Sequence, residues 1–440
     1  MCPPSDLAIA DAFTATPPAV AMTAGERWCE CPDCGLFLTL PTLAPHDVAY
    51  CPRCDAVLRR GRSDSVGRPL VMVVTGLLLL LIASQTSFIE LSISGLGRNS
   101  TVFTGPVALE QQGMWELAVV VLITTIMAPL LRMLAILWVL IGIRLPRLDM
   151  TAQGLLSPNH LSRVFRFAEV LRPWSMVEVF LLGVFVAYTK LIALARVEVG
   201  HAAYAMAALM LVLAAVDACM DREAVWQALD RREGRNTTFA ELPPGPMVGC
   251  DTCGLVSAVG TPHCARCGAR LHIRKPSSII RTWALLLAAA CLYVPANILP
   301  VLTLIRLGRG QPSTIVGGAE ELLRGGMWPL ALLVFVASIM VPVLKLVSLT
   351  IMLVTTHRGS AARLQERTVL YRIVDAIGRW SMIDVFMISI LTALVRMGNL
   401  ASVYPGPGAL AFCAVVILTI LAATSFDPRI MWDAAGERHE

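Results

Sequence analysis

The sequence predicts an all-α polytopic membrane protein built from two tandem parallel repeats, each with four transmembrane helices preceded by a small cysteine-rich module. Composition, eight apolar stretches and an internal duplication support this fold class. Of the 440 residues, 56% are hydrophobic and only 15% are charged, and the mean hydropathy is +0.69. Soluble domains carry about 25% charged residues, and disordered chains need few hydrophobic ones. The composition therefore excludes a soluble enzyme and a disordered chain.

The net charge is small and distributed in short runs. It is 36 − 31 = +5, which we interpret as a membrane orientation signal and not as a nucleic-acid-binding surface. Residues 1–26 contain Asp6, Asp11, Pro17 and Pro18 and lack a basic start, so they do not read as a cleavable signal peptide. We expect a disordered leader there.

Eight apolar stretches are each long enough to cross a bilayer, which takes about 20 residues. Most lack a polar face, unlike the surface helices of soluble proteins. The seventh is short. The stretches cover about residues 69–91, 114–143, 174–197 and 202–220 in the first half and 282–304, 327–354, 380–395 and 408–426 in the second.

The two halves are copies of each other. The nonapeptide RPWSMVEVF at 172–180 recurs as GRWSMIDVF at 378–386, with an offset of 206 residues. Gly113-Met-Trp115 recurs as Gly326-Met-Trp328 with an offset of 213. Because four spans is an even number, both halves enter the membrane in the same direction, as parallel repeats. Asp221 and Trp226 likewise recur as Asp427 and Trp432.

Basic residues indicate the orientation. The loops between the second and third spans of each half and the mid-chain linker are rich in arginine, and such segments stay in the cytoplasm. We therefore expect both termini and both cysteine modules to be cytoplasmic. The expected parts are the leader (1–26), a first cysteine module (27–60), a first membrane module (68–222), a linker (223–245), a second cysteine module (246–273), a second membrane module (279–428) and a tail (429–440).

Eight of the 13 cysteines form four Cys-x-x-Cys pairs. Two pairs separated by sixteen or ten residues can close a tetrahedron of thiolates, as in structural zinc ribbons, and this leaves no open position for catalysis. We expect one Zn²⁺ in each cluster, with rubredoxin-like iron and redox dithiols as alternatives, and Cys29 as a substitute ligand stays open. The ligands are Cys31, Cys34, Cys51 and Cys54 in the first cluster and Cys250, Cys253, Cys264 and Cys267 in the second.

Ionisable residues also recur inside the apolar spans, where a charge costs about 2.5–3.5 kcal/mol and suggests a function. Each half has a base late in its second span and an acid early in its third. We expect these to pair between adjacent helices, either structurally or to couple transport to protons or gate a cavity. A second base lies late in each third span, where snorkelling to the interface is favoured. The residues are Arg132, Glu178 and Lys190 in the first half and Lys345, Asp384 and Arg396 in the second.

Prolines interrupt the same spans. Pro129 and Pro342 precede Arg132 and Lys345 by three residues, and an interior proline removes a hydrogen bond and kinks a helix. In the fifth span Pro295 and Pro300 flank Asn297. Such breaks are tolerated where they line a cavity; kinks satisfied by neighbouring helices are the alternative.

Tryptophans stand at four expected span beginnings, where aromatic belts lie: Trp115, Trp174, Trp328 and Trp380. The chain contains no Gly-x₄-Gly-Lys-Ser/Thr and no His-Glu-x-x-His, so neither P-loop ATP hydrolysis nor zincin proteolysis is expected. Nearly all seven histidines lie outside the spans, which argues against a bis-histidine haem. No enzymatic activity is expected.

The duplicated plan, the two Trp-Ser-Met-x-acid-Val-Phe segments and the Ser425-Phe-Asp-Pro-Arg429 end resemble the paraquat-inducible protein A family of bacterial inner-membrane proteins. The resemblance covers about residues 29–432 and does not decide between PqiA-like and LetA-like members. Two departures are Glu178, where Asp is more usual, and the Asn297-x-x-Pro300 element, which has no clear first-half copy.

The resemblance implies an inner-membrane component of an MCE-type phospholipid transport system. It would pass lipids between the bilayer and a periplasmic MCE-domain tunnel protein, with proton coupling as one energy source, and would help maintain membrane integrity. A small outer-membrane or periplasmic lipoprotein is a further implied partner, and nucleic acid is not. The alternatives are a passive anchor for the MCE protein and a thiol- or zinc-based stress-response protein.

Overall fold

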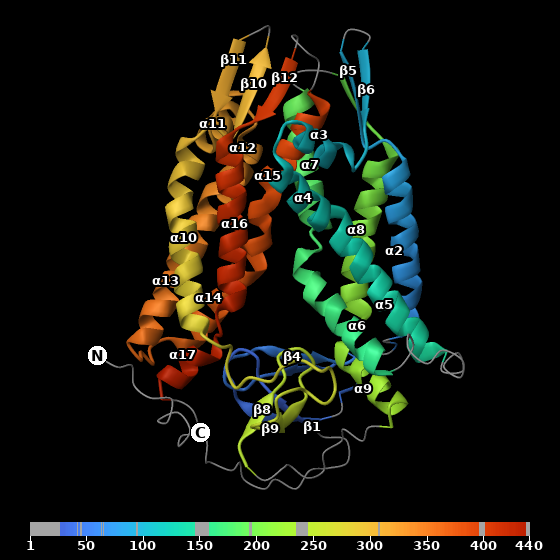
Figure 1. Ribbon diagram of the computed structural model, residues 1–440, viewed down its shortest axis with the longest axis vertical. Helices are drawn as coiled ribbons and strands as arrows, with labels where there is room; N and C mark the ends of the chain where they lie inside the picture. The colour runs from blue at the N-terminus through green and yellow to red at the C-terminus, as the bar shows by residue number, and fades with distance from the viewer. Residues whose placement is uncertain are drawn as a thin grey trace.

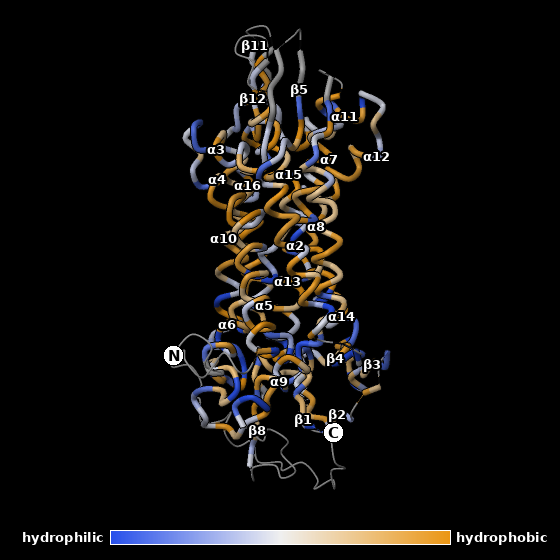
Figure 2. Tube along the Cα trace, turned by 90° about the vertical axis from the view of Figure 1, so that its right-hand side faces the viewer, coloured by the Kyte–Doolittle hydropathy of each residue, from blue (hydrophilic) through white to orange (hydrophobic). Residues whose placement is uncertain are grey.

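The computed structural model describes residues 27–436 except 42, 45, 63, 65, 94–95, 146–157, 193–195, 235–244, 307–308 and 396–400. The predicted leader and Arg396 lie outside the described residues. Within the described residues, eight helical stretches are long and apolar enough to cross a membrane, as predicted, and they form two modules side by side (Figure 1). Hydrophobic residues fill the middle of these helices, and hydrophilic ones collect at the end that carries the cysteine modules (Figure 2).

Each module has four spans. The second span is interrupted by a π turn in both modules, and the third by a 3₁₀ turn. The first module consists of α2 (Gly67–Gln85), α4 (Trp115–Leu122), η2 (Ile123–Met127), α5 (Ala128–Arg144), α6 (Pro158–Leu171), η4 (Arg172–Trp174), α7 (Val177–Ile192) and α8 (His201–Cys219). The second consists of α10 (Ser278–Ile298), α12 (Trp328–Phe335), η5 (Val336–Met340), α13 (Val341–His357), α14 (Leu364–Ile377), η6 (Gly378–Met382), α15 (Ile383–Leu394) and α16 (Pro407–Ser425).

The third span of each module is longer than predicted. It covers His160–Ile192 in the first module and Leu364–Leu394 in the second, because α6 and α14 are amphipathic helices whose charged residues lower the local hydropathy. Trp174 and Trp380 therefore lie in mid-span 3₁₀ turns and not at span beginnings. Trp115 and Trp328 do begin helices, α4 and α12, and are mostly exposed.

Three of the four predicted kink prolines lie beside a π turn or near a helix end. Pro129 and Pro342 stand at the second position of α5 and α13, directly after the π turns η2 and η5. A wider turn accommodates the missing N–H, and π turns of this kind are frequent at functional sites. Pro295 lies inside α10, which ends at Ile298, so the fifth span is shorter than predicted. Pro300 lies beyond that end and kinks no helix.

Two three-stranded antiparallel sheets, which the sequence pattern did not indicate, lie at the end opposite the cysteine modules (Figure 1). They have the same order in both repeats, with the hairpin before the second span and one strand after the third. The strands are β5 (Ile89–Ile93), β6 (Leu96–Ser100) and β7 (Arg196–Val199) in the first module and β10 (Leu302–Arg306), β11 (Arg309–Ser313) and β12 (Ala401–Pro405) in the second. The short helices α3 (Thr104–Gln111) and α11 (Ile315–Arg324) follow the hairpins.

The two modules meet along their third spans. Helix α15 packs against α7 and also against α3 and α4, and all twelve of its residues are buried. The rings of Phe180 and Phe386 meet edge to face across this junction, with centroids 5.7 Å apart. Away from it the helices of the two modules diverge toward the cysteine modules (Figure 1). The third span of the second module is therefore the centre of the molecule.

Candidate functional site

The eight predicted ligand cysteines form two buried clusters. Within each cluster the four Sγ atoms lie within 4.8 Å of one another. Sγ–Sγ distances across the clusters are 3.5 Å (Cys31–Cys54), 3.6 Å (Cys34–Cys51), 3.5 Å (Cys250–Cys267) and 3.4 Å (Cys253–Cys264). These are far longer than a disulfide of about 2.05 Å and close to the roughly 3.8 Å between ligands of a tetrahedral ion with metal–sulfur bonds of about 2.3 Å. Both clusters therefore fit a metal ion, and Cys29 belongs to neither.

The turns that form the clusters require left-handed backbone after the second cysteine of each pair. Gly35, Gly254 and Gly268 have φ between +67° and +72°, and the N–H of Gly35 donates to the carbonyl of Cys31 at 2.9 Å. The fourth turn places Asp55 there with φ of 56°. Aspartate is one of the few residues besides glycine that adopts this conformation readily.

The cysteine modules are exchanged between the membrane modules. The first contains β1 (Arg27–Glu30), β2 (Phe37–Leu40), β3 (Val48–Tyr50) and β4 (Val57–Arg60), and the second contains β8 (Met247–Gly249) and β9 (Val256–Ala258). The first cysteine cluster packs in one hydrophobic group with α13, α14 and the terminal helix α17 (Arg429–Ala434) of the second module. The second cluster packs in the same hydrophobic group as the first module and its helix α9 (Arg222–Arg232).

Repeat-related arginines make the same contact on both sides of this exchange. Arg372 on α14 donates to the carbonyl of Cys54 at 2.9 Å and to Asp33 at 2.6 Å. Its copy 206 residues earlier, Arg166 on α6, donates to the carbonyl of Cys267 at 3.4 Å. Each membrane module therefore contacts the cysteine cluster that precedes the other module.

Glu30 lies where the two cysteine modules meet. Its carboxylate accepts the N–H of Gly249 at 2.7 Å and the guanidinium groups of Arg274 and Arg429 at 3.0 Å each. Arg429 also binds Asp427 at 2.9 Å. Burial raises the pKa of Glu30, whereas these two arginines act in the opposite direction. For Arg429, burial opposes the charge, but its carboxylate partners more than offset this and raise its pKa.

The predicted partners of the charged residues inside the spans are wrong. Arg132 does not pair with Glu178 but binds Asp217 on α8. Glu178 lies 3.5 Å from Arg379, which belongs to η6 of the other module, and both side chains are partly exposed. The reason is geometric, because the second span of each module reaches the fourth span at this depth and the third spans face each other. Asp217 is the only carboxylate in α8, and this isolated acid in an apolar span could have indicated the partner of Arg132.

Lys345 is buried without an ion pair. Its Nζ donates to the carbonyl of Gly378 at 2.6 Å and to the hydroxyl of Thr419 on α16 at 3.3 Å, and it is 1% exposed. No carboxylate of the described residues lies within ion-pair distance, and Asp375 acts on its charge only from farther away. The sequence did not indicate Thr419, because a single threonine in an apolar helix is common.

Asp384 is the second residue of α15, at the junction of the modules, and is 3% exposed. Among the described residues, none donates a hydrogen bond of ordinary geometry to either carboxylate oxygen. Ser338 of η5 lies beside it, and the charge that acts on it belongs to Lys190 on α7. Lys190 points toward α11 of the second module, 3.7 Å from where a Cβ of Gly318 would lie. It thus reaches the other module and does not snorkel to the interface.

Buried hydroxyls without hydrogen-bond partners in the described structure come in repeat-related pairs. Thr125 and Ser338 lie in the π turns, and Ser175 and Ser381 belong to the Trp-Ser-Met motifs. A buried polar group without a partner is costly and rare. The π turn and the motif are therefore polar positions in both modules. Asn297, by contrast, only donates to the carbonyl of Tyr293 in its own helix, at 2.8 Å.

The chain matches the family described as "Paraquat-inducible protein A" twice, over residues 66–230 and 279–436, which agrees with the duplication. It is 33% identical over 417 residues to "Intermembrane transport protein PqiA" of Escherichia coli K12, covering 93% of this chain and 97% of the relative. It is 32% identical over 404 residues to "Lipophilic envelope-spanning tunnel protein A" of the same strain, covering 92% and 91%.

A third relative is the "Probable intermembrane transport protein" of Haemophilus influenzae, which is 24% identical over 413 residues and covers 92% of this chain and 95% of the relative. No solved structure matches the chain.

We expect the purified protein to contain two tightly bound metal ions per chain. Cys34→Ser and Cys253→Ser should each lower the metal content to one ion, because a three-thiolate site binds structural zinc far more weakly. Elemental analysis by mass spectrometry measures this directly. Cys413→Ser is the matched control, since Cys413 is also buried but lies outside both clusters; loss of metal from this variant would contradict the assignment.

Arg429→Ala should destabilise the folded protein by about 3–5 kcal/mol, because it leaves buried Asp427 without its guanidinium partner and buried Glu30 with Arg274 alone. The thermal unfolding midpoint of the purified protein reports this effect. Arg363→Ala provides the comparison. The Arg363 side chain is 79% exposed and pairs only with Glu366, so a change below about 1 kcal/mol is expected. Equal effects of the two substitutions would contradict the role of the Glu30 cluster.

Proposed function

The chain belongs to the paraquat-inducible protein A family, and on this premise we propose that it is the inner-membrane component of a system that moves phospholipids between the inner and outer membranes. Its relatives are named as intermembrane transport and envelope-spanning tunnel proteins. In the proposed function it exchanges lipids with a periplasmic MCE-domain tunnel protein. Transport relatives over more than nine-tenths of the chain, together with eight spans, support this proposal and a non-enzymatic role.

The proposed orientation places both termini and both cysteine modules in the cytoplasm. The spans end there in or beside basic residues, including Arg144, Arg163, Arg358 and Arg363, in accordance with the positive-inside rule. In that reducing compartment the thiols stay available to a metal, and we propose Zn²⁺ in both clusters. Each ion has a structural role, because four thiolates fill a tetrahedral site.

The observation that carries a transport function is that two buried ionisable residues have no ion-pair partner among the described residues: Asp384 at the module junction and Lys345 inside the second module. A passive anchor has no need to keep Asp384 and Lys345 buried without ion-pair partners, since an intramembrane charge is costly and marks a functional site. The proposal assigns these two residues to coupling, with Lys190 across the junction from Asp384. Arg132 and Glu178 have charged partners in place, and we assign them a structural role.

Asp384 and Lys345 also bear on the energy source of the proposed lipid transport. The chain has no P-loop, so a separate ATPase, a lipid gradient or the proton gradient must drive net transport. A carboxyl group and an amine that lie near mid-span can bind and release protons as the two modules rearrange. We propose proton coupling through Asp384 and Lys345.

Asp384→Asn should abolish lipid movement while leaving protein levels unchanged, because the amide preserves shape but cannot carry the charge or exchange the proton. The measurement is labelled phospholipid transfer between inner and outer membranes in a strain that lacks its own copy and redundant pathways. We expect a loss of at least tenfold for Asp384→Asn and a similar loss for Lys345→Met.

Glu178→Gln is the matched control, because Glu178 occupies the repeat-related position but is half-exposed and paired with Arg379. It should retain most of the transfer activity. Full transfer by Asp384→Asn at normal protein levels would reduce the chain to an anchor for its partner. Equal loss in both variants would show that any acid at this helix position is structural.

A further inference from the structure

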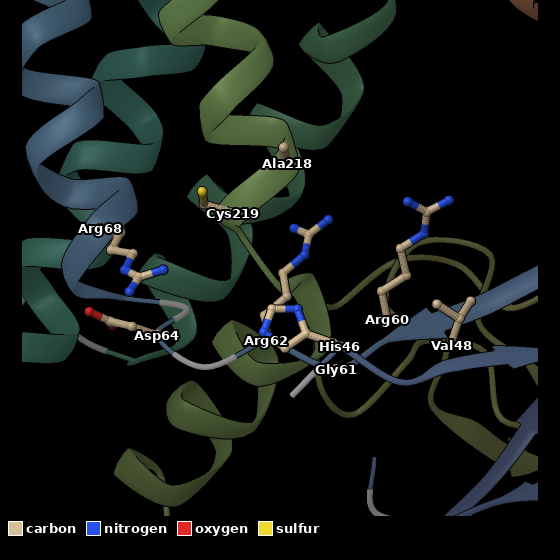
Figure 3. Close-up of a pocket in the computed structure, with 9 residues that line it drawn as sticks. All are labelled: His46, Val48, Arg60, Gly61, Arg62, Asp64, Arg68, Ala218 and Cys219. Atoms are coloured by element: carbon tan, nitrogen blue, oxygen red, sulfur yellow. The ribbon is translucent and has the colours of Figure 1, made fainter. Parts of the chain in front are cut away.

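A cavity of about 330 Å³ lies where the first cysteine module meets the ends of α2 and α8 (Figure 3). This volume falls in the range of about 300–1,000 Å³ of small-ligand pockets. Three arginines and a histidine line it, together with one carboxylate: Arg60, Arg62, Arg68, His46 and Asp64. Neither the metal clusters nor the polar residues of the module junction contribute to it.

The cavity keeps a positive charge that the protein does not neutralise. The carboxylate of Asp64 binds the start of α2. It accepts the N–H groups of Gly67 at 2.7 Å and Val66 at 3.2 Å, and these bonds lower its pKa. Arg62 caps the end of α8, donating to the carbonyl of Asp217 at 3.1 Å. Arg60 and Arg68 are exposed and form no ion pair with any described residue.

The wall of the cavity is fixed by a close backbone approach. The N–H of Gly61 donates to the carbonyl of Asp47 at 2.8 Å, and the N–H of His46 donates to the carbonyl of Gly61 at 3.0 Å. A Cβ at Gly61 would lie 2.0 Å from the carbonyl oxygen of Ala44, so only glycine fits. This contact holds His46 beside the arginines (Figure 3).

Apolar side chains continue from the cavity along both spans. On α2, Val71 and Leu78 stand three and ten residues after Arg68, on the same face of the helix, and are 67% and 56% exposed. On α8, Leu211 stands seven residues before Ala218, which lines the cavity, and is 65% exposed. A ligand that occupies this place has one anionic end and long apolar chains.

We propose that this cavity binds the phosphate group of an anionic phospholipid whose acyl chains lie along α2 and α8. Guanidinium groups form strong charge-assisted hydrogen bonds to phosphate oxygens, and basic pockets at span ends attract anionic headgroups. The bound lipid ties the first cysteine module to the bilayer. The site is independent of the proposed transport function, because none of the residues that line it belongs to the module junction or to the proposed coupling residues.

The test is the retention of phosphatidylglycerol over phosphatidylcholine by the purified full-length protein, measured by native mass spectrometry after exposure to an equimolar mixture. The double variant Arg60→Gln/Arg68→Gln should bind phosphatidylglycerol roughly 30-fold more weakly, given about 1 kcal/mol for each basic residue near an anionic surface. Neither arginine has an ion pair, so the thermal unfolding midpoint should not change.

Arg281→Gln is the matched control. Arg281 is the repeat-related copy of Arg68, is likewise exposed in the first turn of its span, and lies outside this cavity. It should bind phosphatidylglycerol as the unmodified protein does. Unchanged lipid selectivity of the double variant would overturn the proposal, as would displacement of the lipid by inorganic phosphate at equal concentration, which would assign the cavity to a free anion.

Discussion

The packing of α7 against α15 is the contact on which the arrangement of the membrane part depends. Because each repeat has an even number of spans, both run in the same direction, and the same helix of each repeat comes to the shared interface. Gly183 permits the close approach, since a Cβ there would lie 2.8 Å from that of Phe386 and 3.0 Å from the carbonyl oxygen of Ile383. The consequence is a helix, α15, with no exposed residue. Any polar group on α15 therefore needs a hydrogen-bond partner from the protein, from water or from a ligand.

The exchange of the cysteine modules also connects the two halves, at the end of the molecule opposite the sheets. The helices diverge below the junction (Figure 1), and there the connection is made by each metal cluster docking on the other module and by the Glu30 cluster between them. A metal ion bound in either cluster would hold rigid a cysteine module that docks on the other membrane module.

The features that were predictable from the sequence are those that depend on local pattern. Hydropathy located the eight spans, and Cys-x-x-Cys spacing located the ligands of both clusters, because neither depends on how distant segments pack. The partner of Arg132 depends on which spans approach each other, so the nearest acid in the expected order, Glu178, was the wrong choice and Asp217 the right one. The sheets and the module exchange are also tertiary, and strands of three to five residues leave too short a periodic signal.

The differences between the repeats show why the unpaired charges lie in the second module. Arg132 and Lys345 are copies of each other, but the position of Asp217 on α8 is occupied on α16 by Ala423, 206 residues later, so Lys345 loses the counter-charge that Arg132 has. Likewise Glu178 and Asp384 are copies, but the arginine that pairs with Glu178 comes from the second module, and its own copy in the first module is Pro173. The duplication thus preserved the acid and the base in both halves and placed both neutralising partners with the first-half residues. An ion pair that satisfies both partners resists a change in protonation, whereas a buried amine and a buried carboxyl without such partners can change protonation at lower cost. In the proposed coupling, the second module therefore carries the two residues that change protonation, and the ion-paired residues of the first module keep their charges.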